Sequence, residues 1–111
     1  MTGIGGNVSA QLEAKTTARN AIGEAVPIWE ARHTLAGFLD LSNGNARYTA
    51  YNAKMQESTH IFLCDYIELP GVTAENSRMR IGGRVYDVLV IDDPMELHEH
   101  LEIYLKYTGG Q

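Results

Sequence analysis

The sequence contains a single cysteine, Cys64, among its 111 residues. One cysteine excludes an internal disulfide and a multi-cysteine zinc site. Cys64 follows Phe62 and Leu63 in an apolar segment, a setting that favours a small buried hydrophobic residue over a nucleophile. Thiol chemistry is therefore not expected.

Long apolar runs and a leader sequence are also missing. No apolar run approaches the roughly 20 residues of a membrane span, and the first residues lack the basic and apolar regions of a signal peptide. We therefore expect no membrane association and a cytoplasmic start. At 44% hydrophobic and 21% charged residues, the chain has the composition of one ordinary globular domain.

Basic residues are few, since nine Lys and Arg stand against fourteen Asp and Glu, giving a net charge of −5. Duplex binding depends on Lys and Arg that neutralise phosphates, so this balance argues against a nucleic-acid-binding protein. The one basic cluster, Arg78, Arg80 and Arg84, flanks a predicted hairpin turn. We interpret it as charged strand edges that discourage aggregation. Contact with a polyanion or an acidic partner is the alternative.

Alternating apolar residues predict β-strands along much of the chain. The strongest pattern covers residues 84–92, where Tyr86, Val88 and Val90 share one face, and it follows Gly82-Gly83, which supply the positive φ angles of a two-residue turn. Further predicted features are strands over 26–29, 30–41 with a bend or bulge at Gly37, and 58–68, turns at Asn20–Gly23 and Ser42–Asn45, and an ambiguous segment, Tyr48–Met55.

The segment after Asp92 fits two structures. Asp93, Pro94 and Glu96 match the start of a capped helix, and leucines follow it at helical spacing. Residues 97–107 also fit the alternation of a strand. The inward-facing residues would then be Leu97, Leu101, Ile103, Leu105 and Tyr107. Periodicity alone does not decide between helix and strand.

Five or six strands joined by turns, with little helix, predict a mainly β fold. For so short a chain, the closed arrangement is a small antiparallel β-barrel or a sandwich. We predict that residues 1–19 are a flexible N-terminal arm. Residues 20–111 are predicted to form a single β-barrel domain with long loops.

Candidate sites for chemistry are weak. His98 and His100, beside several acidic residues, are the one cluster with metal-ligand atoms, and zinc there is a minor alternative. Asp92 and Asp93 are adjacent, so on a strand they point to opposite faces, and we assign them to capping a turn.

Two further groups also favour a structural interpretation. Gly82-Gly83 and Gly109-Gly110 lack the lysine and the strand–loop–helix context of a phosphate-binding loop. The aromatic residues are assigned to core and rim rather than to a ligand cage: Trp29, Tyr66, Tyr86, Tyr104 and Tyr107. We therefore predict no catalytic, cofactor-binding or metal-binding residues and no enzymatic activity.

Two stretches resemble a known family. GGRVYDVLVIDDPMELHEHLEIYLKYTGG, residues 82–110, looks like the C-terminal half of the XkdH/YqbH proteins of the defective prophage PBSX and related prophages. STHIFLCDY, residues 58–66, is similar to their central strand. Residues 20–29 are similar to the opening hairpin of the wider phage head–tail joining group.

The resemblance implies a structural head-completion or head–tail connector protein with a small antiparallel barrel. Such proteins form a ring between the portal–adaptor and tail-completion proteins, close the filled head and dock the tail. The resemblance also implies a strand over 97–107, and a long loop, Val72–Ser77 or Ser42–Met55, that can line or plug the DNA channel.

Phage DNA is expected to pass through this channel without specific binding. We expect the protein in the virion, at the head–tail interface, after a stage in the host cytoplasm. The main alternative is a small β-barrel module that binds a peptide or saccharide through exposed aromatics such as Tyr86 or Tyr104.

Overall fold

The computed structural model describes residues 6, 8–41, 57–107 and 109. Strands dominate these residues, which confirms the predicted mainly β class. The elements are β1 (Val8–Arg19), β2 (Ala25–Leu41), β3 (His60–Asp65), β4 (Ser77–Ile81), β5 (Arg84–Asp92), the short 3-10 turn η1 (Pro94–Glu96) and β6 (His100–Tyr107). No helix within the described residues is long and apolar enough to span a membrane.

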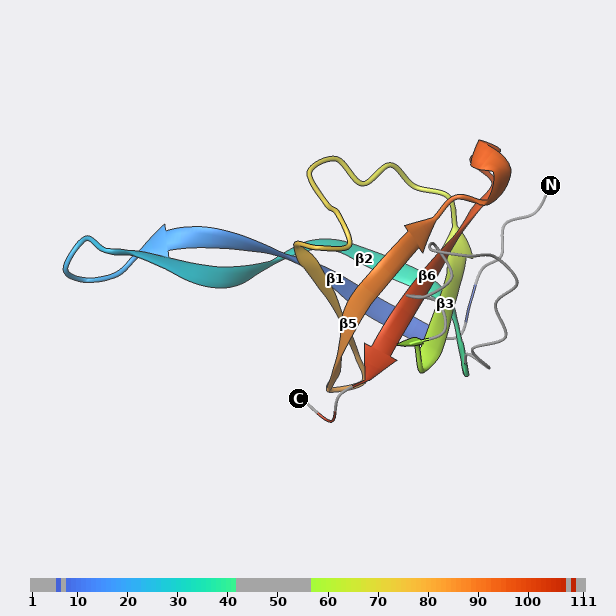
Figure 1. The fold of residues 1–111 in the computed structure, drawn as a ribbon, viewed down its shortest axis with the longest axis horizontal. Helices are drawn as coiled ribbons and strands as arrows, with labels where there is room; N and C mark the ends of the chain where they lie inside the picture. Colours follow the sequence, from blue (N-terminus) through green and yellow to red (C-terminus); the bar gives the residue numbers. More distant parts are fainter. Residues whose placement is uncertain (1–5, 7, 42–56, 108, 110–111) are drawn as a thin grey trace.

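The sheet is antiparallel, and its strand order closes on itself as β1-β2-β3-β6-β5-β4 and back to β1. β4 has a partner on each side, β5 through the Gly82-Gly83 turn and β1 across Ala10–Ala14. Both glycines have positive φ, at 57° and 83°, as the sequence predicts. Figure 1 shows the resulting body, with a β1–β2 hairpin that projects from it. We call the body the closed sheet.

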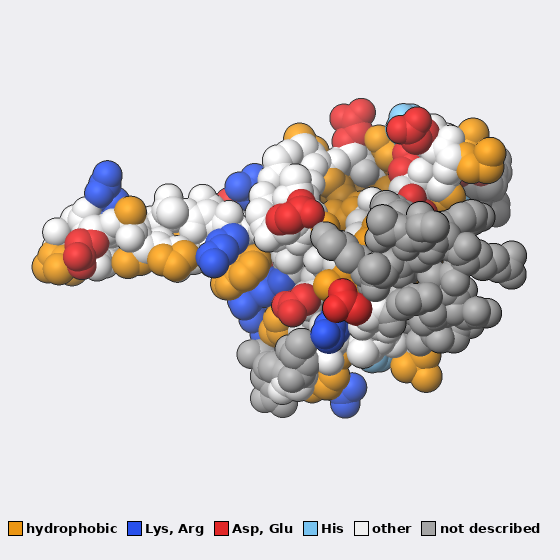
Figure 2. All heavy atoms as spheres, in the orientation of Figure 1, with side chains coloured by type: hydrophobic (Ala, Val, Ile, Leu, Met, Phe, Trp, Pro, Cys, Tyr) orange, Lys and Arg blue, Asp and Glu red, His pale blue; other side chains and the backbone are white. Residues whose placement is uncertain are grey.

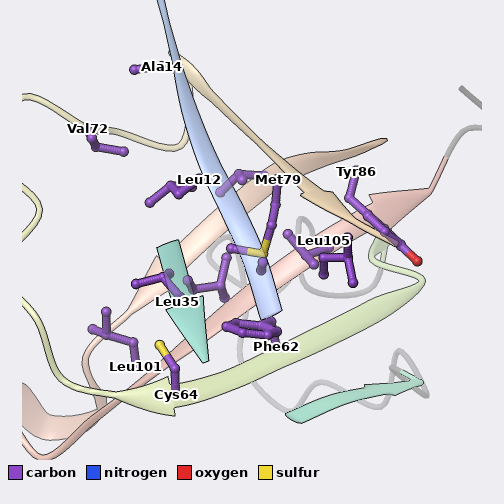
Figure 3. Packing of buried hydrophobic residues seen from close by; sticks show 14 residues of the cluster. Leu12, Ala14, Leu35, Phe62, Cys64, Val72, Met79, Tyr86, Leu101 and Leu105 are labelled. Atoms are coloured by element: carbon purple, nitrogen blue, oxygen red, sulfur yellow. The ribbon is translucent and has the colours of Figure 1, made fainter. Parts of the chain in front are cut away.

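Inward-facing side chains from all six strands fill the closed sheet (Figure 3). The period-2 alternation of strands places Tyr86, Val88 and Val90 on the inner face of β5. On β6 the inner residues are Leu101, Ile103 and Leu105, all buried. Burying one such side chain contributes roughly 1.5–3 kcal/mol, so these alternating residues are the main source of stability.

β1 corrects the predicted flexible arm of residues 1–19. From Val8 onward the chain pairs with β2 on one side and, in its first half, with β4 on the other. Ala10, Leu12 and Ala14 point into the core and are buried. Small alanines give a weak apolar signal in the sequence, yet here Ala10 and Ala14 are part of the core. The folded domain therefore begins before residue 20.

The extended segment predicted to start over 26–29 and to continue over 30–41 is confirmed as one strand, β2, of 17 residues. The register irregularity lies opposite Leu12 and Glu13, whose partners are His33 and Ala31, so the predicted bulge at Gly37 is misplaced. Gly37 is needed for a different reason. A Cβ there would lie 2.2 Å from the carbonyl oxygen of Leu63, so only glycine permits this approach of β2 to β3.

The segment after β5 is neither the predicted helix nor a strand from its first residue. Pro94–Glu96 form one 3-10 turn, and β6 begins at His100. Leu97, expected on the inner face, is 59% exposed. The strand implied by the family resemblance is correct from His100 onward and wrong for residues 97–99.

The Val72–Ser77 loop packs on the body of the protein. Val72 is buried, and the N–H of Thr73 donates to Asn76 Oδ1 at 2.8 Å. Asn76 Nδ2 donates in turn to the carbonyl of Gly71 at 3.0 Å. The predicted turn Ser42–Asn45, the ambiguous segment Tyr48–Met55, the candidate loop Ser42–Met55 and Gly110 lie outside the described residues.

Candidate interaction surfaces

The most exposed element is the outer part of the β1–β2 hairpin, residues 16–28, which we call the hairpin arm (Figure 1). Thr16–Arg19 pair with Ala25–Ile28. β4 meets β1 only up to Ala14, and β3 meets β2 only from Gly37 onward. Within the described residues, no strand therefore pairs with either outer edge of the arm.

The tip of the hairpin arm is ordered by hydrogen bonds around Asn20. Asn20 Oδ1 accepts the N–H of Ile22 at 3.1 Å and that of Glu24 at 2.9 Å. Arg19 Nη1 donates to the carbonyl of Gly23 at 2.6 Å, and Gly23 has a φ of 85°, which favours glycine. The predicted turn is confirmed, and it presents Ile22 with 78% of its surface exposed.

The base of the arm uses the predicted basic cluster. Arg78 Nε lies 2.6 Å from Glu13 Oε1, and Arg80 Nε lies 3.5 Å from Glu13 Oε2. The Arg78 guanidinium also stacks over Trp29 at 4.3 Å, a contact worth about 0.5–1 kcal/mol at such sites. The interpretation as free strand edges is wrong for β4, because both of its sides are paired. These arginines instead contact Glu13 and Trp29 where the arm joins the body.

The connection between β5 and β6, residues 93–99, is a second exposed feature, and we call it the β5–β6 loop. Met95, Glu96 and His98 have positive φ angles of 54°, 55° and 57°, which are uncommon for non-glycine residues. The Asp93 carboxylate holds this shape by accepting the N–H of His98 at 3.0 Å and by contacting the His98 ring nitrogen Nδ1 at 2.5 Å. The predicted turn-forming role of Asp93 is confirmed.

The two candidate metal-binding histidines are not brought together on one strand face. His98 lies in the β5–β6 loop, where its ring packs on Tyr66 at 4.5 Å. His100 lies in β6, and its Nε2 is 3.1 Å from Glu102 Oε2. In the part of the chain that the structure describes, no three His, Cys, Asp or Glu side chains are grouped as metal ligands.

The aromatic residues occupy core and rim positions. Tyr86 is only 2% exposed and packs against Tyr107 at 5.3 Å and His60 at 5.1 Å. Tyr104 is partly buried, and its hydroxyl donates to Glu102 Oε1 at 3.1 Å. Neither tyrosine is presented as an open stacking platform.

Cys64 and His60 both show the effect of burial. Cys64 belongs to the core, as predicted, and desolvation followed by the charge of Asp65 raises its pKa to about 11. The thiol is therefore a poor nucleophile. Desolvation, followed by the charge of Arg84, lowers the pKa of His60.

An open hollow of about 460 Å³ lies between the Val72–Ser77 loop and β5. Its apolar lining includes Leu69, Val72, Val90 and Ile91. A smaller, polar share of the lining comes from Thr73 and Glu75, so the hollow offers shape and apolar contact without a cluster of reactive groups.

Similar folds have been solved in other proteins. Protein SF1141 from Shigella flexneri 2a matches with a TM-score of 0.65 and 17% identity over 100% of both chains. A chain from the virion of the native gene transfer agent particle matches with a TM-score of 0.56 and 15% identity, over 89% of this chain and 91% of that one. No curated protein matches the sequence.

The sequence match that goes beyond fold is to a family model described as phage head completion protein, over residues 6–106. The match spans nearly every described residue, so the chain belongs to the phage head completion protein family. This is a family of structural virion proteins and not of enzymes. The chain is accordingly a structural phage head protein that associates with other components of the virion.

Proposed function

We propose that the chain forms a ring between the portal–adaptor complex and the tail-completion proteins, where it closes the filled head and docks the tail. The observation that carries this proposal is the hairpin arm, whose edges have no strand partner among the described residues, in a member of the head completion family. We take the closed sheet as the small β-barrel expected of such a connector.

A ring of identical subunits needs a heterologous interface, in which two different surfaces of each subunit meet around the circle. The hairpin arm supplies one such surface, since it carries backbone groups at its edges and an exposed isoleucine at its tip. The closed sheet supplies a stable body that holds the arm in a fixed direction.

The charge of the protein suits a DNA conduit. A net charge of −5 does not attract phosphates, and Arg78 and Arg80 both contact the one carboxylate of Glu13. Arg84 lies over the Tyr107 ring at 5.3 Å. DNA would therefore pass through the channel without specific binding, and no mobility shift is expected at physiological salt.

The finer assignments belong to the same proposal. They are membership of the XkdH/YqbH group of PBSX-like prophages, residence in the host cytoplasm before assembly, and the head–tail interface as the position in the virion. The alternative of a peptide- or saccharide-binding module loses its basis, because Tyr86 is buried and the Tyr104 hydroxyl is bonded to Glu102.

The proposal is tested by size-exclusion chromatography with light scattering, on the chain alone and after mixing with the portal–adaptor complex encoded nearby. We expect a monomer or weak oligomer alone and a shift into a stoichiometric, ring-sized complex after mixing. A chain that stays monomeric at high concentration and never joins the complex would contradict the proposal.

A further inference from the structure

Two exposed apolar features lie at opposite ends of the molecule. One is the tip of the hairpin arm, where Ile22 is 78% exposed. The other is the β5–β6 loop, where Met95 is 87% exposed and Leu97 is 59% exposed. Figure 1 shows the arm at one end of the long axis and η1, which lies in this loop, at the other end of the body.

The hairpin arm does not serve the core of its own subunit. None of residues 16–28 is buried, and a two-stranded ribbon without further packing is marginally stable in water. Its tip is nevertheless held by the Asn20 hydrogen bonds and by Arg19. An ordered tip that displays an isoleucine to solvent is a surface prepared for another molecule.

The β5–β6 loop is prepared in a comparable way. Left-handed backbone at Met95, Glu96 and His98 is unfavourable for non-glycine residues and persists only where neighbouring contacts enforce it. Asp93 and the Tyr66 ring supply that enforcement through His98. Met95 and Leu97 gain no burial within the subunit from this backbone, so both side chains are accessible to a partner.

Charge favours the two ends as partners for each other. The β5–β6 loop carries Asp93, Glu96 and Glu99. The hairpin arm itself carries Arg19 and Glu24, and Lys15 lies just before it. At its base Arg78 and Arg80 share Glu13, and Figure 2 shows basic side chains gathered there. The arm counted with its base is therefore net positive, whereas the β5–β6 loop is net negative. Opposite charges at the two ends favour a head-to-tail arrangement of copies. Contact between two identical ends would bring like charges together and is disfavoured.

We propose that the tip of the hairpin arm of one copy docks on the β5–β6 loop of the next, with Ile22 against Met95 and Leu97. The inference rests on the proposed ring and specifies its subunit interface. Because the two surfaces differ and lie at opposite ends, the contact repeats from copy to copy, and it closes when the rotation between copies divides the circle.

The test is a pair of cysteines, Ile22→Cys with Leu97→Cys, in the full chain assembled into particles. Buried Cys64 does not compete, since its raised pKa and burial keep it unreactive. A disulfide forms only when the two Cα atoms come within about 7 Å of each other. Oxidation is expected to give a ladder of covalent dimers, trimers and higher multimers on a non-reducing gel.

Three matched controls define the result. Ile22→Cys alone and Leu97→Cys alone should give no ladder. Ile22→Cys with Leu41→Cys should give none either, although Leu41 is 74% exposed. Absence of the ladder from particles that contain the double variant would overturn the docking inference while leaving the ring intact. Absence of the wild-type chain from the particles would instead overturn the proposed function.

A second variant tests the contact if the double-cysteine chain is poorly incorporated into particles. Ile22→Asp places a carboxylate against the acidic loop, so incorporation into particles should fall at least tenfold, which corresponds to at least about 1.4 kcal/mol. Thermal unfolding of the isolated variant should match the wild type. Leu41→Asp is the control and should be incorporated normally. Normal incorporation of Ile22→Asp would contradict the proposed contact.

Discussion

Phe38 and Phe62, the two phenylalanines of the chain, occupy opposite faces of the sheet. Phe62 of β3 is fully buried, whereas Phe38 of β2 is 42% exposed. They are offset by one position, since Phe38 pairs with Leu63 and Phe62 pairs with Leu39. Phe62 therefore contributes to the stability of the core, whereas Phe38 is half exposed and contributes less.

Substituting Phe62→Ala should lower the free energy of unfolding by about 3–5 kcal/mol, because it removes buried apolar surface and leaves a cavity. The matched substitution Phe38→Ala should cost only about 1 kcal/mol. Urea denaturation of both variants measures the difference. Equal losses would show that Phe62 does not hold the core position described here.

His60 should make stability depend on pH. Its pKa is lowered from 6.5 in the folded protein, so the unfolded chain takes up a proton at higher pH than the folded chain. The free energy of unfolding therefore falls as pH drops below about 6.5, until the folded ring is also protonated.

The variant His60→Gln removes this contribution. Between about pH 7.5 and pH 5.5, the wild type should lose more stability than His60→Gln does, as measured by urea denaturation at each pH. Parallel loss in the two proteins would contradict the lowered pKa.

At the scale of elements, the sequence predicts strands well where β-branched and aromatic residues alternate densely, as in β5 and in β3 around Phe62. β1 is missed because its inward residues at Ala10 and Ala14 are small, and its burial depends on pairing with β2 and β4. The hairpin arm is also missed, because its length depends on where β3 and β4 stop pairing with β2 and β1. Those end points are not visible in the local sequence.

The β5–β6 loop shows a second limit of sequence patterns. Leu97 fits both a helical and an alternating pattern, yet positive φ angles at Met95, Glu96 and His98 turn it outward. No local pattern signals left-handed backbone at residues other than glycine and asparagine. The contacts of Asp93 and Tyr66 with His98 become visible only in three dimensions.

Gly37→Ala should destabilise the β2–β3 pairing. The added Cβ would lie 2.2 Å from a backbone oxygen of Leu63, which flexible side chains cannot relieve, so we expect a loss of about 1–3 kcal/mol or more. The control is Ala36→Gly, at the adjacent outward position, which should cost less than about 1 kcal/mol. Denaturation midpoints compare them, and a neutral Gly37→Ala would contradict this close approach.

Shortening the hairpin arm should separate folding from assembly. Replacing residues 17–27 by Asn-Gly joins the paired residues Thr16 and Ile28 through a favoured two-residue turn. Because the arm contains no buried residue, the free energy of unfolding should stay within about 1 kcal/mol of the wild type, while joining of the portal–adaptor complex should be lost. A shortened chain that fails to fold would contradict the arm's independence from the core.

The whole molecule is elongated by its arm. The radius of gyration is 14.8 Å, compared with about 13 Å for a compact domain of this length, and the principal extents are 49 × 31 × 26 Å. A stable closed body with a projecting arm suits a part that joins copies around a circle. On the proposed account, the stability of the subunit and its assembly therefore depend on different residues.

The most direct test of the central claim is cryo-electron microscopy of particles that contain the chain, compared with particles from a strain that lacks its gene. We predict a ring of closed sheets between the portal–adaptor complex and the tail, each with its arm reaching the next copy, and heads without tails in the deletion strain. Complete particles in the deletion strain, or density for the chain elsewhere in the virion, would contradict the account.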